Sequence, residues 1–562
     1  MTLQPLIECV PNFSEGVDLH IIKQITDEIE KTEGVKLLDV DPGKATNRTV
    51  VTFVGTPDAV VKAAFEAIKK ASELIDMSAH KGEHPRMGAT DVCPLIPVSG
   101  ISMEETAAYA HKLGKMVGDQ LHIPVYMYEA AATSPERKNL AIIRSGEYEG
   151  LQAKLQDSNW KPDYGPAMFH KKSGATVIGA RDFLVAYNVN INTTSVRRAN
   201  SIAFDVRENG RVKKDETSGK PVIGIDGMPE RIPGTCKSVK AIGWFIQEYG
   251  IAQISMNLTN IRETALHEAF EACCNSASTR GMRVTGSELV GLVPKQVLID
   301  AGKYFLQKQK RSAGISEDDI IHIAVKSLGL DELGPFEPKK KIIEYLLEDK
   351  SASPLIHKNL IGFADETASE SPAPGGGSIS AYVGALGVAL GTMVANLSAQ
   401  KQGWEDQLHY FSEVAVQGQI LKDKLLKLVD EDTRAFDGIM DAFRLPKNND
   451  AEKLIRKEAI ASATKHAINI PLEVMATSWQ SMEMISKMAE RGNPNSVTDA
   501  GVGILCARTA VEGAYLNVCI NCKGFEDEAF RENALSQAQN ILEKANKLAE
   551  AVMVNVRALA GA

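Results

Sequence analysis

Twelve residues from His80 to Asp91 combine side chains that could carry acid–base chemistry. The stretch HKGEHPRMGATD contains two histidines, a glutamate, a lysine and an arginine beside two glycines and a proline. Because the glycines and the proline prevent a regular helix, the pattern predicts a polar loop, and loops held by a rigid scaffold often carry catalytic groups. Histidine suits proton transfer near neutral pH, although an isolated pair of histidines can equally serve as hydrogen-bonding groups of a surface loop.

A carboxylate and an arginine from a nearby loop extend this set. Asp41 ends an expected strand, and Arg48 opens the next strand after a short loop. With Arg86 and either His80 or His84, they would suit the transfer of a group between two nitrogen nucleophiles. The histidine would take a proton from the attacking amine and return it to the leaving amine. The carboxylate would fix the histidine tautomer or stabilise developing positive charge, and the arginines would hold substrate carboxylates.

A second loop, from Tyr164 to Gly174, is bounded by glycines and is both basic and aromatic. Such a loop could grip a flat heterocycle and an acidic tail, and an exposed loop between domains is the competing interpretation. The residues expected to make these contacts are Gly165, Pro166, Phe169, Lys171, Lys172 and Gly174.

Three consecutive glycines open a long apolar segment in the second half of the chain. Gly375, Gly376 and Gly377 precede Ser378, the expected N-cap of a helix. This arrangement would expose backbone N–H groups to an anion, although a flexible linker can have the same composition.

Further polar groups lie on later expected helices. The run Asp430-Glu431-Asp432 is part of an amphipathic helix, where carboxylates two residues apart point in different directions. At most one of Asp430 and Asp432 can therefore face a site, and a solvated acidic patch is the alternative. Asn517 and Asn521 are one turn apart, and they either face a site or satisfy polar groups inside a bundle.

The segments that must position these residues change character along the chain. Residues 1–183 alternate strand and helix patterns, with an amphipathic helix at 56–77 before the histidine loop, which predicts an α/β unit with a mixed sheet. Residues 184–330 predict a smaller α/β unit, and residues 331–357, rich in Pro, Lys and Glu, predict a linker with one short helix. Residues 358–562 predict an all-α bundle, so the expected fold is two α/β subdomains followed by a helical bundle.

Two details of these units are specific enough to check. The expected strands 184–192 and 254–259 place amide and hydroxyl side chains on one face, which either lines a polar cleft or faces solvent. In the bundle, glycines early in the first helix permit close helix–helix approach. The expected helical runs are 378–400, 406–443, 450–470, 471–491, 497–520 and 527–558.

Composition excludes several classes of protein. The chain has 562 residues and a net charge of −9, which gives no electrostatic argument for binding nucleic acid or anionic membranes. Eight cysteines are too few for a disulfide scaffold, and Cys519 and Cys522 lack the further ligands of a zinc site. The first residues do not form a signal peptide, and the uncharged segment 378–400 is expected to be a buried core helix, so we expect a cytoplasmic protein.

Long motifs in both halves of the chain resemble the formimidoyltransferase–cyclodeaminase family. The first half is similar to its formiminotransferase domain in ECVPNFSEG, LLDVDPG…NRTV, DMSAHKGEHPRMGATDVCPLIPV and the PDYGP loop. The second half is similar to its cyclodeaminase domain in PAPGGGS, LVDEDTRAF, RLPKN and GAYLNVCIN. The likeness runs the length of the chain in the same domain order.

The resemblance implies two consecutive reactions on a folate. The formimino group of N-formimino-L-glutamate would move to N5 of tetrahydrofolate, and N10 would then close onto the formimino carbon with loss of ammonia. The resemblance places the catalytic acid/base of the first step at His84, an orienting carboxylate at Asp41 and a substrate-carboxylate clamp at Arg48. It places folate contacts at Gly165–Gly174, and we add Gly375–Ser378 to them. The catalytic aspartate of the second step would be Asp432.

The resemblance also implies partners and leaves alternatives open. Tetrahydrofolate, expected in polyglutamylated form, would be the co-substrate, neither step needs a metal, and the family forms a ring-like octamer. One alternative is a transferase whose helical half serves only oligomerisation, and another is a folate-binding scaffold without turnover. The presence of both His84 and Asp432 argues against these alternatives, because a pure binder needs neither acid/base group.

Overall fold

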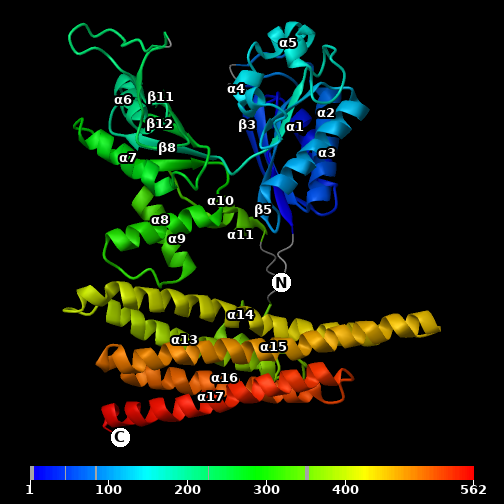
Figure 1. Cartoon of the computed structure of the whole chain (residues 1–562), viewed down its shortest axis with the longest axis vertical. Coiled ribbons are helices and arrows are strands. Elements are labelled where there is room, and N and C mark those ends of the chain that lie inside the picture. The colour runs from blue at the N-terminus through cyan, green and yellow to red at the C-terminus, as the bar shows by residue number, and fades with distance from the viewer. Residues whose placement is uncertain (1–4, 45, 83–84, 226, 348–353, 562) are drawn as a thin grey trace. The chain divides into compact units, whose positions relative to one another are not determined.

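The computed structural model describes residues 5–44, 46–82, 85–225, 227–347 and 354–561. The chain forms two compact units, and their elements can be followed in Figure 1. The first unit comprises Met1–Leu298 and Leu328–Leu347, and the second, helical unit comprises Ile299–Ser327 and Glu348–Ala562. The expected fold class, mixed-sheet α/β followed by long helices, is confirmed.

The first unit begins with a seven-stranded mixed sheet. Two short strands, β1 and β2, together fill the place between β4 and β5, and both pair antiparallel with these neighbours. Strands β5, β7 and β6 are parallel to one another. From one edge to the other, the strands are β3 (Val35–Gly43), β4 (Arg48–Gly55), β1 (Leu6–Cys9) with β2 (Asn12–Phe13), β5 (Thr90–Ser99), β7 (Thr176–Ala180) and β6 (Val125–Glu129).

Both faces of this sheet are covered, because its central strands are apolar on both sides. Val125 and Met127 of β6 join the core formed with helices α1 (Leu19–Glu30), α2 (Pro57–Leu74) and α3 (Met103–Leu121). Tyr126 and Tyr128 of the same strand point the other way, into a smaller core. That second core is closed by α4 (Leu140–Ile143) and α5 (Glu147–Gln156).

A second, four-stranded antiparallel sheet follows in the chain. Its order is β11 (Val239–Ile246), β12 (Ile251–Leu258), β8 (Val185–Ile191) and β13 (Val284–Val290). A separate two-stranded ribbon consists of β9 (Arg211–Val212) and β10 (Arg231–Ile232). Helix α6 (Val196–Val206) packs on β11 and β12, and α7 (Leu266–Ser278) packs on β8 and β13.

Two of the amide groups expected on one face of this sheet, Asn188 and Asn190, are paired with protein groups. Asn190 is fully buried; its Oδ1 accepts from Gln253 Nε2 at 2.8 Å, and its Nδ2 donates to Glu332 Oε2 at 2.5 Å. Asn188 is 6% exposed and donates to Glu288. These two amides therefore belong to a buried polar network, and neither a solvated face nor an open cleft describes them.

The segment predicted to be a linker differs from the expectation over its described first part. It contains two short helices, α10 (Pro338–Lys341) and α11 (Ile343–Leu347), and belongs to the first unit. Ile342 and Ile343 are buried, and Ile342 forms a β-bridge with Val293. The surrounding lysines and glutamates suggested a solvated chain, but this pair of isoleucines anchors it.

The boundary expected at residue 330 also differs. Helices α8 (Lys295–Lys308) and α9 (Glu317–Leu328) follow β13, and most of both helices belongs to the helical unit, which includes Ile299–Ser327. The backbone N–H of Ala313, between these helices, donates to Ser412 Oγ at 3.0 Å. Asn396 Nδ2 donates to the carbonyl of Gly314 at 2.8 Å.

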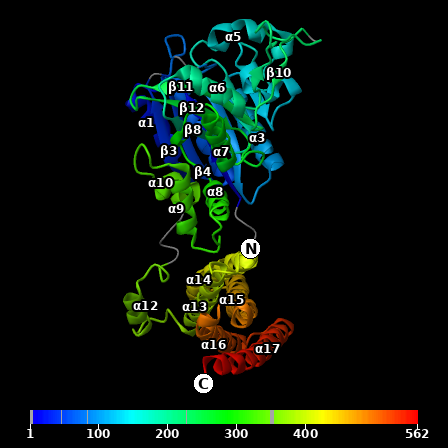
Figure 2. The ribbon, with the colours of Figure 1, turned by 90° about the vertical axis from the view of Figure 1, so that its left-hand side faces the viewer.

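The helical unit is built from long helices packed side by side, which Figure 2 views along their axes. Helix α13 contacts α14, α15 and α16, while α17 packs on α15 and α16. Besides most of α8 and α9, the helical unit contains α12 (Leu360–Thr367), α13 (Gly376–Ala399), α14 (Leu408–Arg444), α15 (Asp450–Arg491), α16 (Val497–Cys522) and α17 (Glu528–Ala560).

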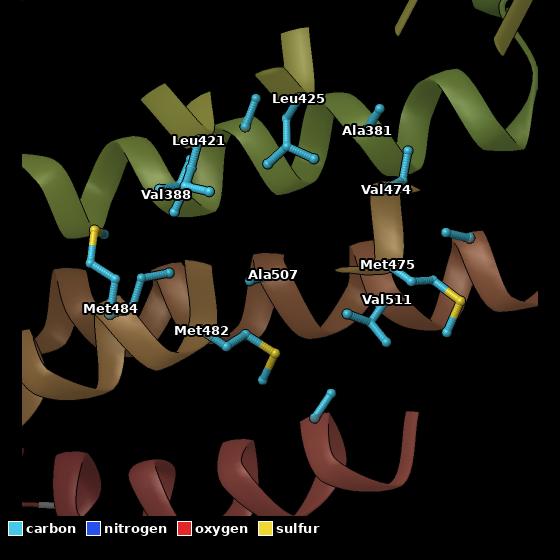
Figure 3. Close-up of a cluster of buried hydrophobic side chains, with 14 of the residues drawn as sticks. Ala381, Val388, Leu421, Leu425, Val474, Met475, Met482, Met484, Ala507 and Val511 are labelled. Carbon is cyan, nitrogen blue, oxygen red and sulfur yellow. The ribbon is translucent and has the colours of Figure 1, made fainter. Parts of the chain in front are cut away.

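Aliphatic and methionine side chains from α13, α14, α15, α16 and α17 interdigitate in one core, and Figure 3 labels members of this core on α13 to α16. Helix α13 has the length and composition of a membrane span, but 61% of its most apolar window is buried. The prediction of a buried core helix is therefore confirmed. A Cβ at Gly387 would lie 2.8 Å from the carbonyl oxygen of Gly503, so glycine at these positions lets α13 and α16 approach closely.

One predicted helix break is wrong. We expected separate helices ending at 470 and starting at Pro471, because proline removes the hydrogen bond to the carbonyl four residues earlier. Helix α15 instead continues through Pro471. The carbonyl of Ala467, which Pro471 cannot satisfy, accepts a 2.8 Å hydrogen bond from Asn521 Nδ2 of α16. A neighbouring helix thus supplies the missing donor.

Candidate active sites

A buried polar cluster forms where strands β2, β4 and β5 meet. Arg48, the first residue of β4, donates from Nε and Nη2 to Asn12 Oδ1 at 3.0 and 2.6 Å. Burial lowers the pKa of Arg48 to about 10, while the nearby Asp91 carboxylate opposes this shift. The guanidinium therefore remains charged at neutral pH and retains its capacity to bind an anion.

Asp91 enters this cluster through a β-bulge. Asn12 pairs with Val92 and Phe13 pairs with Thr90, so Asp91 is the extra residue on β5. A bulge of this kind re-aims a side chain, and Asp91 is fully buried. Its Oδ1 accepts from the backbone N–H of Met87 at 3.0 Å, and its Oδ2 pairs with Arg144.

Sequence reasoning assigned no role to Asn12 or Arg144, and it included Asp91 only as the last residue of the candidate loop, without a role of its own. A polar residue flanked by apolar strand residues was the available signal for Asn12 and Asp91. Both positions are buried, at 7% and 0% exposed, and a buried polar group requires a partner. Arg144 lies in a helical connection where the sequence carries no comparable signal.

Both ring nitrogens of His80 are engaged within the loop. Its Nε2 lies 3.0 Å from the carbonyl oxygen of Asn47 and therefore carries the proton, while Nδ1 accepts from Arg86 Nε at 3.3 Å. Arg86 also pairs with Glu147 at 3.1 Å and with Glu149 at 2.8 Å. These contacts indicate that His80 and Arg86 hold the loop in its conformation. They argue against the role of substrate clamp that was considered for Arg86. His84 and the preceding glutamate lie outside the described residues.

Asp41 lies on the edge strand of the sheet, where its side chain is exposed. It pairs with Val50, two positions from the Gly43–Arg48 pair on the same two strands. We expected Asp41 to end a buried strand, but β3 is an edge strand that continues to Gly43. Burial and the charge of Asp41 raise the pKa of its neighbour Asp39.

The structure brings the two predicted loops of the first unit together. Ala89 N–H donates to the carbonyl of Ser173 at 2.8 Å, and Ala175 N–H donates to that of Met87 at 3.1 Å. Gly174 has a φ of +67°, and a Cβ there would overlap the Met87 carbonyl, so only glycine fits. The end of the loop at 164–174 thus lies against the histidine loop.

In the loop from Tyr164 to Gly174, some of the residues predicted to contact the ligand pack against the rest of the protein, and others are exposed. The carbonyl of Tyr164 accepts from Val125 N–H at 2.9 Å, which holds Gly165 and Pro166 near β6. Phe169 packs against Tyr148 with ring centroids 5.4 Å apart. Lys171 and Lys172 are exposed, although the Lys172 ammonium donates to the backbone carbonyl of Glu73, so Lys171 is the more accessible of the two to an anion.

In the helical unit, the side chains of the three consecutive acidic residues 430–432 lie in three different environments. Asp430 is buried and accepts backbone N–H groups of Leu355 and Ile356 at 2.9 and 3.4 Å. Glu431 pairs with Arg434 at 2.7 Å. Asp432 lines a pocket. The expectation that at most one of Asp430 and Asp432 faces a site is confirmed, and the alternative of a solvated acidic patch is wrong for Asp430.

Asp432 of α14 lies beside the first turn of helix α13. The hydroxyl of Ser378 is 2.9 Å from the carbonyl of Val429 and 3.1 Å from Asp432 Oδ2, and either oxygen can accept its proton. Burial raises the pKa of Asp432, while hydrogen bonds from the Ser378 hydroxyl and N–H oppose the shift. The helix begins at Gly376 with Gly375 as N-cap, not with Ser378 as expected, so Ser378 lies within the first turn and its buried hydroxyl supports the carboxylate.

The pocket around Asp432 encloses about 190 Å³. Its walls come from the glycine-rich entry to α13, from one face of α14, and from single turns of α15 and α16. The lining residues are Pro372, Ala373, Gly375, Gly376, Gly377, Asp432, Thr433, Ala435, Phe436, Ile439, Ala467, Asn517 and Asn521.

Glycine at position 377 is required by this geometry. A Cβ there would overlap Asp432 Oδ1 and lie 2.6 Å from Oδ2. We expect Gly377→Ala to displace the carboxylate and lower the rate at this site about a hundredfold, because a displacement of about 1 Å can have that effect. The control is Gly438→Ala on α14, where no atom lies within 4 Å of the added Cβ. Equal rates for both variants would contradict the prediction.

Metal-ligating side chains are not clustered in the part of the chain that the structure describes: no group of three or more His, Cys, Asp or Glu is placed to hold an ion. The polar groups that gather at both sites are instead carboxylates, amides, arginine and backbone N–H groups. Such groups can move protons and bind anions.

Three family models match successive parts of the chain. They are the formiminotransferase domain, N-terminal subdomain, over residues 6–181, the formiminotransferase domain over 186–348, and formiminotransferase-cyclodeaminase over 359–540. These matches cover both units in chain order.

Named relatives match the whole chain or one half of it. A formimidoyltransferase-cyclodeaminase of Mus musculus is 41% identical over 557 residues, which is 99% of each chain. A glutamate formimidoyltransferase of Thermoplasma acidophilum is 44% identical and covers 54% of this chain and 92% of its own. A methenyltetrahydrofolate cyclohydrolase of Methylorubrum extorquens is 36% identical and covers 35% of this chain and 94% of its own. With full-length identity at this level, the chain belongs to the formimidoyltransferase-cyclodeaminase family.

Proposed function

We propose that this chain is a bifunctional folate enzyme of histidine degradation. It transfers the formimino group from N-formimino-L-glutamate to N5 of tetrahydrofolate, which releases L-glutamate. It then cyclises 5-formiminotetrahydrofolate to 5,10-methenyltetrahydrofolate, which releases ammonia. The observation that carries the proposal is the full-length match to formimidoyltransferase-cyclodeaminases, together with a glutamate formimidoyltransferase that matches the first half alone.

In the first reaction, N5 of tetrahydrofolate attacks the formimino carbon and the bond to the glutamate nitrogen breaks. We assign the proton transfer between these two nitrogens to His84. We assign the substrate carboxylate to Arg48, which is held by Asn12 and charged at neutral pH, and a supporting role to Asp41 on the adjoining strand. His80 and Arg86 hold the loop, as their hydrogen bonds support.

The exposed part of the second loop is assigned to the folate. Its basic residues Lys171 and Lys172 suit the carboxylates of a glutamate tail, and polyglutamylated folate is part of this proposal. Phe169 and the glycine-bounded backbone from Gly165 to Gly174 shape the loop.

In the second reaction, N10 attacks the formimino carbon and the carbon–nitrogen bond to the leaving amino group breaks. Asp432 either protonates the departing ammonia or accepts the proton from N10. A raised pKa suits a carboxyl group that exchanges protons near neutral pH. The first-turn backbone of Gly375–Ser378, beside the carboxylate, is assigned to folate binding.

A cytoplasmic location and assembly into a homo-oligomer are further parts of the proposal. All eight cysteines are free thiols, which fits a reducing compartment. An apolar stripe on α13 and α16 supports assembly, because these helices pack together and exposed contiguous apolar surface often marks an interface. The stripe consists of Leu386, Met393, Leu397, Val502, Leu505, Leu516 and Ile520.

Charges in this apolar stripe should disrupt assembly. Leu386 and Leu505 are 46% and 42% exposed, so glutamate at both positions is tolerated within one chain but would be buried in an interface. We expect L386E/L505E to elute as a smaller species in size-exclusion chromatography with light scattering, and Ser536→Glu on exposed α17 surface to leave the mass unchanged. An unaltered mass for the double variant would place the interface elsewhere.

The proposed function is tested by mixing the purified protein with formiminoglutamate and tetrahydrofolate. The rise of the methenyl absorption band, the release of glutamate and the release of ammonia are followed together. All three should appear in wild type. Glutamate without ammonia or methenyl product would leave a transferase with a structural helical unit, and binding without any product would leave a folate-binding scaffold.

A further inference from the structure

The pocket at Asp432 has side chains whose chemistry the two reaction steps do not use. Asn517 and Asn521 line it from α16, and Phe436 lines it from α14, one turn beyond Asp432. We infer that these three residues recognise the pterin ring of the cyclisation substrate: the two amide oxygens accept hydrogen bonds from its amino-pyrimidine edge, and the phenyl ring packs on its face. This inference rests on the proposed cyclisation activity.

Hydrogen bonds fix the orientation of each amide group. Asn517 Nδ2 donates to the carbonyl of Gly513 at 2.8 Å, and Asn521 Nδ2 donates to that of Ala467 at 2.8 Å. Because a carbonyl accepts only from the amide nitrogen, neither side chain can be turned around without losing its bond. The Oδ1 atoms therefore remain as acceptors beside the pocket.

Two acceptors in this arrangement select a particular kind of ligand. The residues are four apart on one helix, so their side chains follow one another along a single face at about one helical turn, roughly 5.4 Å. The pterin pyrimidine carries a 2-amino group and a ring N–H on one edge, and both are donors. A site that accepts hydrogen bonds discriminates strongly against an analogue that lacks the donor, because the buried acceptor then loses its partner.

The apolar side of the pocket completes the fit to a flat ring. Phe436 and Ile439 lie on the same face of α14 as Asp432, and the Phe436 side chain is 41% exposed although it lines the pocket. An aromatic ring in that position gains contact when a heterocycle packs on it. With acceptors on α16, an aromatic wall on α14 and Asp432 at the glycine entry, each part of the substrate meets a matching group.

The test measures cyclisation of supplied 5-formiminotetrahydrofolate by full-length protein, so that the transferase site is not involved. The second substrate is its 2-desamino analogue, in which hydrogen replaces the amino group. For Asn517→Ala we expect KM for the normal substrate to rise about tenfold with kcat within about threefold, the signature of lost binding. Wild type should show a similar rise in KM for the analogue, and N517A should show little further rise. The control is Asn540→Ala on exposed α17 surface.

Two further variants separate recognition from a structural role. Asn521→Ala also removes the donor to Ala467, so its melting temperature should fall as well as its KM rise. Phe436→Ala should raise KM for both substrates equally. If the increases in KM caused by N517A and by the desamino analogue multiply when the two are combined, the inference is overturned. An unchanged KM in N517A would also overturn it. If wild type does not cyclise the supplied substrate at all, the proposed second activity fails, and the inference fails with it.

Discussion

Asp432→Asn is expected to lower the rate of cyclisation by about a hundredfold or more, because general acid–base catalysis typically contributes that much. The amide keeps the shape of the side chain and can still accept from the Ser378 hydroxyl, which lies 3.1 Å from Oδ2, but it cannot exchange a proton. Transfer should continue in the first unit. With formiminoglutamate and tetrahydrofolate, glutamate should be released at the normal rate while 5-formiminotetrahydrofolate accumulates.

The pH dependence distinguishes the two roles left open for Asp432. Burial is the main cause of its raised pKa. If the acid form protonates the departing ammonia, the wild-type rate falls as pH rises through this pKa. If the carboxylate accepts the N10 proton, the rate instead falls as pH drops through it.

Folding stability gives an independent check on the same shift. A pKa raised in the folded state stabilises the protein fully below the unfolded pKa, and this contribution is lost as pH rises through the folded pKa. Because asparagine does not titrate, the melting temperature of D432N relative to wild type should increase over that interval. A D432N enzyme with wild-type cyclisation would exclude Asp432 from catalysis, and a variant that melts far below wild type would attribute the loss to unfolding.

Much of the architecture could be predicted because it depends on local periodicity. Alternation in β6 sends Val125 and Tyr126 to opposite cores, and the apolar composition of α13 matches its central place in the bundle. The glycines of α13 also signalled close packing, as the contact of Gly387 with Gly503 shows. These features need no knowledge of distant segments.

The features that could not be predicted depend on contacts between distant segments. Asp91 reaches the cluster near Arg48 through a register shift between strands, and no local pattern specifies such a shift. Pro471 stays within a helix because Asn521, fifty residues later, satisfies the carbonyl of Ala467. Local propensity is overridden in both places by a partner from another element.

In the candidate sites too, sequence spacing limits how many side chains can face a site, and packing between helices determines which side chain does. Helical geometry limited Asp430 and Asp432 to one site-facing carboxylate, and the packing of α14 puts Asp432 at the pocket while Asp430 accepts a backbone N–H elsewhere. Of the two histidines of the loop, the spacing alone left the choice open, and the family resemblance favoured His84. The structure shows that both ring nitrogens of His80 are engaged, which supports a positional role for His80.

Replacing these two histidines in turn is therefore expected to give different defects in the transferase. His84→Ala should lower kcat for transfer by about a hundredfold or more, the usual contribution of an acid/base group. Cyclisation of supplied 5-formiminotetrahydrofolate should stay at the wild-type rate. His80→Ala should act through the loop: loss of its bonds to Asn47 and Arg86 should raise KM and lower the melting temperature, with a smaller change in kcat.

Added imidazole separates a chemical role from a positional one. A free base can replace the proton acceptor that His84→Ala removes, so transfer should recover in proportion to imidazole concentration. It cannot rebuild the connection from Asn47 through His80 to Arg86, so His80→Ala should not respond. Rescue of His80→Ala alone would assign the acid/base role to His80, and wild-type transfer by His84→Ala would remove His84 from the mechanism. Because the pair differs only in which imidazole of one loop is lost, the comparison identifies the residue that moves the proton between N5 and the glutamate nitrogen.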